Sequence, residues 1–133
     1  MPAKAFLDTN VLVYAIAQND SRSNRAEELL REGGMLSIQV LNEFVSVARR
    51  KLLMSWQEVT DALAAVRVLC PDPVALTLEV HDAAVKLSQK YGYGIYDGLV
   101  VAAALDAGCT TLYSEDLHDR QVIDGRLKIQ NPF

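Results

Sequence analysis

The stretch AKAFLDTNVLVYA, residues 3–15, decides the fold of this chain. Residues 3–7 suit a short buried strand, and residues 11–17 suit a helix that follows it almost without a loop. Asp8 lies at the junction between the two elements. An unpaired carboxylate is costly to bury, so an acid at this junction requires a partner or a function.

The rest of the chain repeats this alternation of strand and helix. Further strands are predicted at 35–38, 74–78, 110–114 and 126–130, and helices over 23–32, 39–53, 55–69, 80–91 and 97–107. Ser55 and Glu58 form the sequence pattern of a capping box. This order predicts an α/β domain whose mostly parallel sheet is covered on both faces by right-handed crossovers.

Length and composition limit the possible classes of protein. A chain of 133 residues, half of them hydrophobic, is about one globular domain, so we expect residues 1–133 to form a single unit. Its longest apolar run is too short to span a membrane, and the N-terminus does not resemble a signal peptide. We therefore expect a cytoplasmic protein in which Cys70 and Cys109 are inert reduced thiols.

Four acids stand where the predicted strands end or the next helices begin: Asp8, Glu43, Asp97 and Asp116. Each has an ordinary explanation on its own, as a helix cap, a surface glutamate or a turn residue. Together they should reach the same rim of the sheet, where α/β folds place their chemistry. Like charges there would raise each other's pKa unless a cation neutralised them.

Carboxylate oxygens are the ligands that Mg²⁺ and Mn²⁺ prefer. One such ion can generate a nucleophilic hydroxide from water, and a second can stabilise the leaving oxygen of a displacement. The net charge of −4 argues mildly against a broad basic surface for nucleic acid, but not if clustered acids hold metal. The residues therefore predict metal-dependent phosphodiester hydrolysis with one or two Mg²⁺ or Mn²⁺ ions.

Four segments, FLDTNVLVYA, SIQVLNEF, YDGLVVAAAL and LYSEDL with the terminal NPF, resemble the PIN domain, particularly the VapC-type toxins of toxin-antitoxin pairs. The resemblance implies a three-layer α/β/α sandwich with a five-stranded sheet and a metal-dependent endoribonuclease. It implies that Asp8, Glu43, Asp97 and Asp116 form the acidic site, with Asp8 and Asp97 as direct metal ligands. Glu43 and Asp116 would bind directly or through water.

The resemblance also assigns supporting residues. Ser114 matches a hydroxyl that supports the acids, and Asn10 matches a polar residue beside the first acid. Glu115 is the rival of Asp116 for the position of fourth acid, and the register of the family favours Asp116. The resemblance further implies an RNA substrate, a partner antitoxin and a homodimer.

Three residues depart from the usual family pattern. Tyr96 and Gly98 stand where Trp and Ala are common, which we expect to be small changes in packing. Arg120 stands where Gly is frequent and bears on the conformation of the loop after Asp116.

Several other residues have both a functional and an ordinary interpretation. His118 could contact substrate or simply be solvated. The basic residues of 48–51, and Arg22 with Arg25, could bind RNA phosphates or only solvate a helix. The tyrosines near the predicted last helix could stack on bases or pack in the core, namely Tyr91, Tyr93 and Tyr96.

Competing functions make different demands on the sequence. A haloacid dehalogenase-type phosphatase needs a second Asp two residues after the first, where this chain has Asn10. A phosphoacceptor receiver domain needs a lysine just after a late strand to bind the phosphoryl group, and we find none there. Glu43 would also have no role in such a domain. A stand-alone RNA-processing nuclease, or a domain that only binds RNA or protein, remains open.

Overall fold

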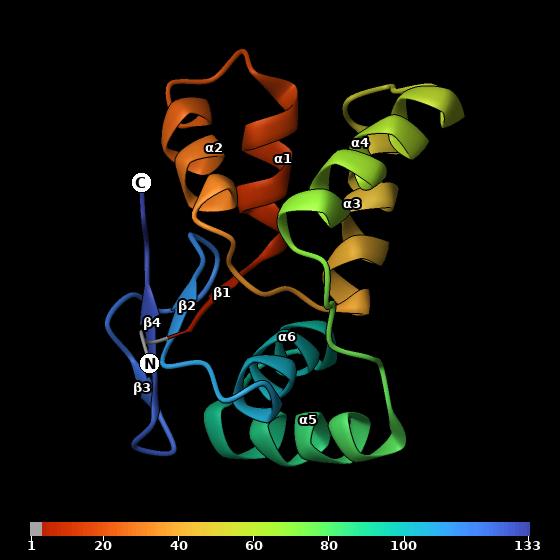
Figure 1. Cartoon of the computed structure of the whole chain (residues 1–133). Helices are drawn as coiled ribbons and strands as arrows, with labels where there is room; N and C mark the ends of the chain where they lie inside the picture. Colours follow the sequence, from red (N-terminus) through yellow and green to blue (C-terminus); the bar gives the residue numbers. More distant parts are fainter. Residues whose placement is uncertain (1–3) are drawn as a thin grey trace.

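The computed structural model describes residues 4–133, so Ala3, the first residue of the predicted N-terminal strand, lies outside the described residues. Strands and helices do not strictly alternate as predicted: among the described residues one strand is followed by six helices and then by three strands (Figure 1). The elements are β1 (Ala5–Leu7), α1 (Thr9–Ala17), α2 (Ser23–Arg31), α3 (Ile38–Arg50), α4 (Trp56–Leu69), α5 (Leu78–Tyr91), α6 (Ile95–Asp106), β2 (Thr111–Tyr113), β3 (Val122–Ile123) and β4 (Leu127–Gln130).

The strands form one sheet in the order β1-β2-β4-β3. The pairs β1 with β2 and β2 with β4 are parallel, and β3 pairs antiparallel with β4. Phe6 and Leu7 are consecutive in β1 and both are fully buried. Because neighbouring strand residues point to opposite faces, both faces of β1 are covered. The α/β prediction with a mostly parallel sheet is therefore confirmed.

The predicted number of five strands is wrong, because the sheet has four among residues 4–133. Residues 35–38 and 74–78 were predicted as strands, but only the bridges Phe6 to Met35 and Ser37 to Val74 form there. Ser37 already caps α3 and Thr77 already caps α5, so helix starts too soon for either segment to extend. The short β3 was not predicted.

Helices that are consecutive in the sequence pack in pairs, and α3 contacts a helix of each of two pairs. Figure 1 shows α1 and α2 together in the upper part of the view, α5 and α6 together in the lower part, and α3 and α4 beside them. α1 contacts α3, and α3 contacts α6, so α3 joins the two helix pairs. The Thr9 hydroxyl in the first turn of α1 donates to Glu43 on α3 at 2.8 Å, so this turn lies beside α3.

Two local features that the sequence singled out are the capping box of α4 and Arg120 in the loop after Asp116. Ser55 and Glu58 form the predicted capping box of α4. Arg120 has a φ of 70°, in the left-handed region that glycine adopts most easily. Its N–H donates to the carbonyl of Ile129 at 2.8 Å. Arg120 therefore adopts the backbone conformation for which glycine is suited at this position.

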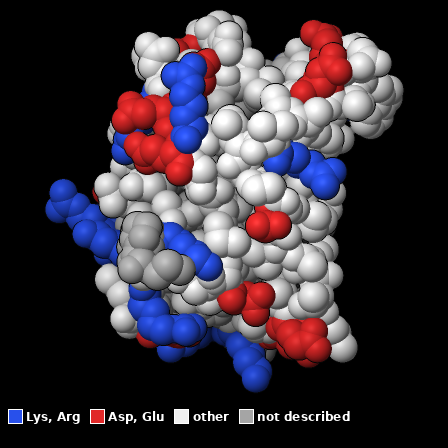
Figure 2. All heavy atoms as spheres, in the orientation of Figure 1, with Lys and Arg blue, Asp and Glu red and all other residues white. Residues whose placement is uncertain are grey.

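The surface carries both signs of charge. On the face drawn in Figure 2, acidic and basic side chains both appear, and neither forms one continuous patch. Within residues 4–133 no helix is long and apolar enough to cross a membrane.

At Gly98, α6 packs very closely against α5. A Cβ added there would lie 2.4 Å from the Ser88 Oγ and 2.8 Å from the Ala84 carbonyl oxygen. Real Cβ atoms essentially never come so near to backbone oxygen. The expectation that Gly98 is only a small change in packing is therefore wrong: α5 lies closer to α6 than an alanine would allow.

Gly98→Ala is accordingly expected to lower the free energy of unfolding by about 2 kcal/mol, since overpacking outweighs the roughly 1 kcal/mol by which alanine favours a helix. Urea denaturation monitored by circular dichroism measures this change. Gly94→Ser is the matched control, because a Cβ at Gly94 meets nothing within 4 Å and serine caps a helix well. An unchanged midpoint for Gly98→Ala would contradict the close approach.

Candidate functional site

Asp8 is a buried acid held in a fixed position. It follows β1 and is the N-cap of α1, where its Oδ1 accepts from the Thr9 N–H at 2.7 Å. Its Oδ2 accepts from the Ser114 hydroxyl at 2.7 Å, and the residue is only 4% exposed. Asp8 can therefore cap α1 with one carboxylate oxygen and still belong to the predicted acidic site, because its other oxygen accepts from Ser114, the residue that follows β2.

Burial raises the pKa of Asp8 from 3.8 to about 6, although the hydrogen bonds from Ser114 and Thr9 lower it. Glu43 and Asp116 raise the pKa further by their negative charges. Asp8 is therefore a carboxylate whose charge lacks a cationic partner among the described residues, which is the condition that a bound metal ion would relieve.

Ser114 and Asn10 connect Asp8 to Asp116. The fully buried Ser114 hydroxyl donates to Asp8 and accepts from the Asp116 N–H at 3.1 Å. The Asn10 amide donates to Asp116 Oδ2 at 3.2 Å and to Ser114 Oγ at 3.4 Å, and its oxygen accepts from the Glu115 N–H at 3.4 Å. These bonds fix the turn after β2 against the start of α1.

Glu43 reaches the same place from α3. Its Oε2 accepts from the Thr9 hydroxyl at 2.8 Å, and its Oε1 accepts from Gln39 Nε2 at 3.2 Å. Glu43 is therefore not a free surface glutamate. Thr9 and Gln39 are functional candidates that the sequence did not indicate, since a threonine in the first turn of a helix and a glutamine four residues before an acid are common.

Asp97 lies in the first turn of α6, whose N-cap is Gly94. The interpretation of Asp97 as the helix cap is therefore wrong. Partial burial raises the pKa of the Asp97 carboxyl, and the charges of Glu43 and Asp116 raise it further. Asp97 thus lies within electrostatic range of two of the other acids.

The acids form an electrostatic cluster but not a closed cage. No group of three or more His, Cys, Asp or Glu side chains among residues 4–133 is arranged so that it could hold an ion by itself. The donors are all oxygens, and the raised pKa of Asp8 reflects burial and neighbouring negative charge. This donor set fits a hard ion that keeps several of its waters, as Mg²⁺ usually does, rather than one enclosed by protein.

Glu115 is engaged elsewhere. Its Oε1 accepts from the Arg22 guanidinium at 3.0 Å, and its Oε2 accepts from the Tyr14 hydroxyl. Arg22 also lies over the Tyr14 ring, 4.1 Å from its centroid, and binds Asp20 at 2.7 Å. Burial and the Glu115 carboxylate raise the pKa of Tyr14 to about 12. Glu115 thus has a cation and a hydroxyl of its own, while Asp116 is turned toward Asn10.

Two of the four predicted acids, Glu43 and Asp116, line a pocket of about 630 Å³, whereas Asp8 and Asp97 are not among its lining residues. Its walls come from α1, α3, the start of α6 and the turn after β2, and they are lined by Thr9, Asn10, Val13, Tyr14, Gln39, Asn42, Glu43, Ser46, Val47, Arg50, Lys51, Tyr96, Glu115 and Asp116. Arg50 and Lys51, two cations of the basic segment 48–51, therefore lie in the same pocket as two of the predicted acids.

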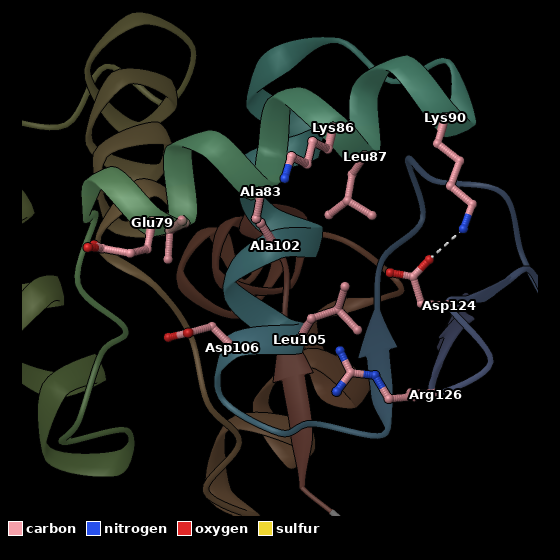
Figure 3. A pocket seen from close by; sticks show the side chains of 11 residues that line it. Glu79, Ala83, Lys86, Leu87, Lys90, Ala102, Leu105, Asp106, Asp124 and Arg126 are labelled. Atoms are coloured by element: carbon pink, nitrogen blue, oxygen red, sulfur yellow. Dashed lines mark hydrogen bonds and ion pairs between the residues drawn. The ribbon is translucent and has the colours of Figure 1, made fainter.

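A second pocket, of about 350 Å³, lies between α5, α6 and the turn between β3 and β4. Figure 3 shows charges of both signs around its apolar floor, including the ion pair of Lys90 with Asp124 at 3.0 Å. None of the four predicted site acids lines it.

Other candidates have structural roles or lie apart from the acids. The Tyr93 hydroxyl donates to Gln121 at 2.8 Å and the Tyr91 hydroxyl donates to Asp124 at 2.9 Å, which ties α5 to the β3–β4 region. His118 lines a separate hollow with residues 119–121. Arg25 pairs with Glu28 at 3.0 Å, and Cys70 and Cys109 are buried free thiols.

Solved structures with the same fold include toxins and toxin-antitoxin complexes. VapC20 of Mycobacterium tuberculosis, a toxin described as cleaving the sarcin-ricin loop, is 20% identical, with 84% of this chain and 88% of that chain covered and a TM-score of 0.69. A toxin-antitoxin complex from Klebsiella pneumoniae is 17% identical over 98% of both chains, with a TM-score of 0.73. DNA-bound VapBC from Salmonella typhimurium is 20% identical over 96% of this chain and 98% of that chain, with a TM-score of 0.60.

No curated protein matches the sequence. At identities of 20% and below, the solved structures establish the fold. The sequence itself matches the PIN domain family over residues 5–122, a range that contains all four acids. The chain therefore belongs to the PIN domain family.

Proposed function

We propose that this protein is an endoribonuclease that hydrolyses RNA phosphodiester bonds with Mg²⁺ or Mn²⁺. The observation that carries the proposal is the acidic cluster, in which burial and the negative charges of Glu43 and Asp116 raise the pKa of Asp8 and of Asp97. Such a cluster is costly unless cations bind it. Membership of the PIN domain family supports the same reaction.

In this proposal Asp8 and Asp97 bind the metal directly, and Glu43 and Asp116 bind it directly or through water. When bound, one or two ions would supply an activated water and neutralise charge on the phosphate and the leaving oxygen. Ser114 and the Thr9 N–H hold both oxygens of Asp8, so the carboxylate is oriented before substrate arrives. Asn10 orients Asp116, and Thr9 with Gln39 orients Glu43.

Between the two rivals for the fourth acid, we assign Asp116. The Arg22 guanidinium already neutralises Glu115 and the Tyr14 hydroxyl donates to it, whereas the side chain that donates to the Asp116 carboxylate is the neutral Asn10 amide. A cation is therefore needed more by Asp116 than by Glu115.

The metal requirement is the direct test of this function. Purified protein, freed of any bound partner, is expected to cleave RNA in the presence of Mg²⁺ or Mn²⁺ and to lose this cleavage in excess chelator. Gel electrophoresis of a total RNA preparation measures both. Readdition of the ion should restore activity, whereas undiminished cleavage in chelator would refute metal-dependent hydrolysis.

We further propose that the protein is the toxin of a toxin-antitoxin pair. The structural neighbours that are toxins or toxin-antitoxin complexes support this assignment and, with it, a cognate antitoxin. A homodimer and action in the cytoplasm are part of the same proposal. Apolar side chains that are well exposed give surface for such partners, among them Leu53, Trp56, Val68 and Leu78. A stand-alone RNA-processing enzyme would share the chemistry but need no antitoxin.

The toxin assignment predicts an effect on growth. Induced expression without an antitoxin is expected to arrest bacterial growth, and Asp8→Asn should abolish the arrest because it removes a carboxylate from the cluster. Viable counts after induction measure this, with immunoblots to show equal amounts of both proteins. Two equally harmless proteins would argue against a toxin and in favour of the RNA-processing or non-catalytic alternative.

A further inference from the structure

The first turn of α6 carries Asp97, but no side chain of its N-cap residue fixes this end of the helix. Asp8 caps α1 with its own carboxylate, and the Ser37 hydroxyl caps α3, the helix of Glu43. The N-cap of α6 is Gly94, which has no side chain that could accept a hydrogen bond. Other contacts must therefore hold the start of α6, and with it Asp97, in place among the acids.

Tyr93, the residue directly before Gly94, makes such a contact. Its hydroxyl donates to the Gln121 side-chain oxygen at 2.8 Å, although the two residues are 28 positions apart in the sequence. Burial raises the pKa of the Tyr93 hydroxyl, and the charges of Tyr91 and Asp97 raise it further. Tyr93 is thus half-buried, lies within electrostatic range of Asp97 and binds a loop from a distant part of the chain.

Gln121 is a fixed point in the loop between β2 and β3, which begins with the turn of Asp116. Its carbonyl accepts from the Ile129 N–H at 2.8 Å, so this loop is fastened to β4. Asp97 and Asp116 lie within electrostatic range of each other. The hydrogen bond from Tyr93 to Gln121 therefore joins the segment that carries one acid to the segment that carries the other.

We propose that Tyr93 is a positioning residue of the acidic site: by donating to Gln121, its hydroxyl sets the distance between the start of α6 and the loop of Asp116. The inference rests on the proposed metal site, because Asp97 and Asp116 are two of the carboxylates assigned to the ion. Tyr93 lies outside the lining of the pocket that Glu43 and Asp116 share, so it acts through the acids. A residue that orients metal ligands in this way affects how tightly the ion binds.

The affinity for Mn²⁺ tests this role without any RNA. Calorimetric titration of the full-length protein is expected to show about tenfold weaker Mn²⁺ binding in Tyr93→Phe, because phenylalanine keeps the ring but cannot donate to Gln121. Gln121→Leu removes the acceptor and should weaken binding by a similar factor. Since both variants break the same hydrogen bond, the double variant should bind Mn²⁺ no more weakly than either single variant.

Tyr91→Phe is the matched control. The Tyr91 hydroxyl donates to Asp124 Oδ1 at 2.9 Å and accepts from the Asp124 N–H at 2.9 Å, so phenylalanine removes two hydrogen bonds. Asp124 lies in the turn between β3 and β4 and lines the second pocket, away from the four acids (Figure 3). Tyr91→Phe should lower the midpoint of urea denaturation at least as much as Tyr93→Phe and leave Mn²⁺ affinity unchanged. Equal weakening of Mn²⁺ binding in the two variants would indicate general loosening and overturn the positioning role.

RNA cleavage gives an independent readout. Tyr93→Phe is expected to need about tenfold more Mn²⁺ for half-maximal cleavage, whereas the KM for RNA at saturating Mn²⁺ should equal that of the wild type. A raised KM together with unchanged Mn²⁺ affinity would mean that Tyr93 contacts RNA itself, and the positioning role would fail.

The outcomes also separate this role from the proposed function. If the wild type binds Mn²⁺ but cleaves no RNA, while Tyr93→Phe and Gln121→Leu bind the ion more weakly, the nuclease function fails and the positioning role stands. If the wild type binds Mn²⁺ and cleaves RNA, and both variants bind the ion as tightly as the wild type does, the function stands and the positioning role fails. A wild type that binds no Mn²⁺ would overturn both.

Discussion

Asp97→Asn is expected to reduce the rate of RNA cleavage by at least about 10³-fold, which corresponds to roughly 4 kcal/mol of lost transition-state stabilisation. The variant keeps the size and shape of the side chain but removes a negative charge proposed to bind metal. The fold should be retained, because partial burial and the charges of Glu43 and Asp116 already disfavour an ionised Asp97 in the metal-free protein. Single-turnover cleavage with Mg²⁺, together with circular dichroism, separates loss of activity from loss of structure.

The neighbouring acids supply the comparison for Asp97. Asp116→Asn should also lower cleavage strongly, whereas Glu115→Gln should retain most activity, because Glu115 faces Arg22 and Tyr14. Since the two residues are adjacent in the sequence, general damage to this turn would affect both variants alike. Equal losses in Asp116→Asn and Glu115→Gln would contradict the assignment of Asp116, and full activity of Asp97→Asn would contradict the metal site.

Asp8→Asn is expected to change the pH dependence of stability of the metal-free protein. Because the pKa of Asp8 is raised from 3.8 to about 6, the folded protein binds a proton more tightly than the unfolded chain does. The free energy of unfolding therefore falls as pH rises from about 4 to about 6 and stays lower above that range. The penalty from this one group is roughly 3 kcal/mol at neutral pH.

The measurement is urea denaturation of wild type and Asp8→Asn in chelator at several pH values. Asparagine cannot ionise, so the stability of the variant relative to wild type should increase by roughly 3 kcal/mol between acidic and neutral pH. The variant loses part of the hydrogen bonding with Ser114, so it should be the less stable protein at about pH 4. A stability difference that does not vary with pH would mean that the pKa of Asp8 is not raised in the folded protein.

The energetic cost of burying the ionised Asp8 carboxylate opposes stability to function at this residue. A divalent ion should raise the melting temperature of the wild type more than that of Asp8→Asn, since an ion that binds only the folded state stabilises it by mass action. The residue that destabilises the metal-free protein is thus the one through which the proposed cofactor would stabilise it.

The sequence predicted much of this protein, because its main signals are local. The strand at β1, the helix after it and the capping box at Ser55 depend on residues close together in the chain. The positions of Asp8, Glu43 and Asp116 relative to strand and helix ends follow from the same patterns, whereas α6 begins at Ile95, before Asp97. What failed was the length of the second and third predicted strands, since Ser37 and Thr77 start helices there.

Only the tertiary structure decided which groups face each other. Adjacent acids such as Glu115 and Asp116 are equivalent in a sequence pattern, and the partners that separate them, Arg22 and Asn10, lie more than 90 residues away along the chain. The same holds for Gly98, whose neighbours on α5 are set by helix packing, and for the placement of Arg50 in the pocket of Glu43. Local patterns determine elements and their ends, because backbone hydrogen bonding and apolar periodicity act over a few residues, whereas charge pairing and close packing depend on which elements the fold brings together.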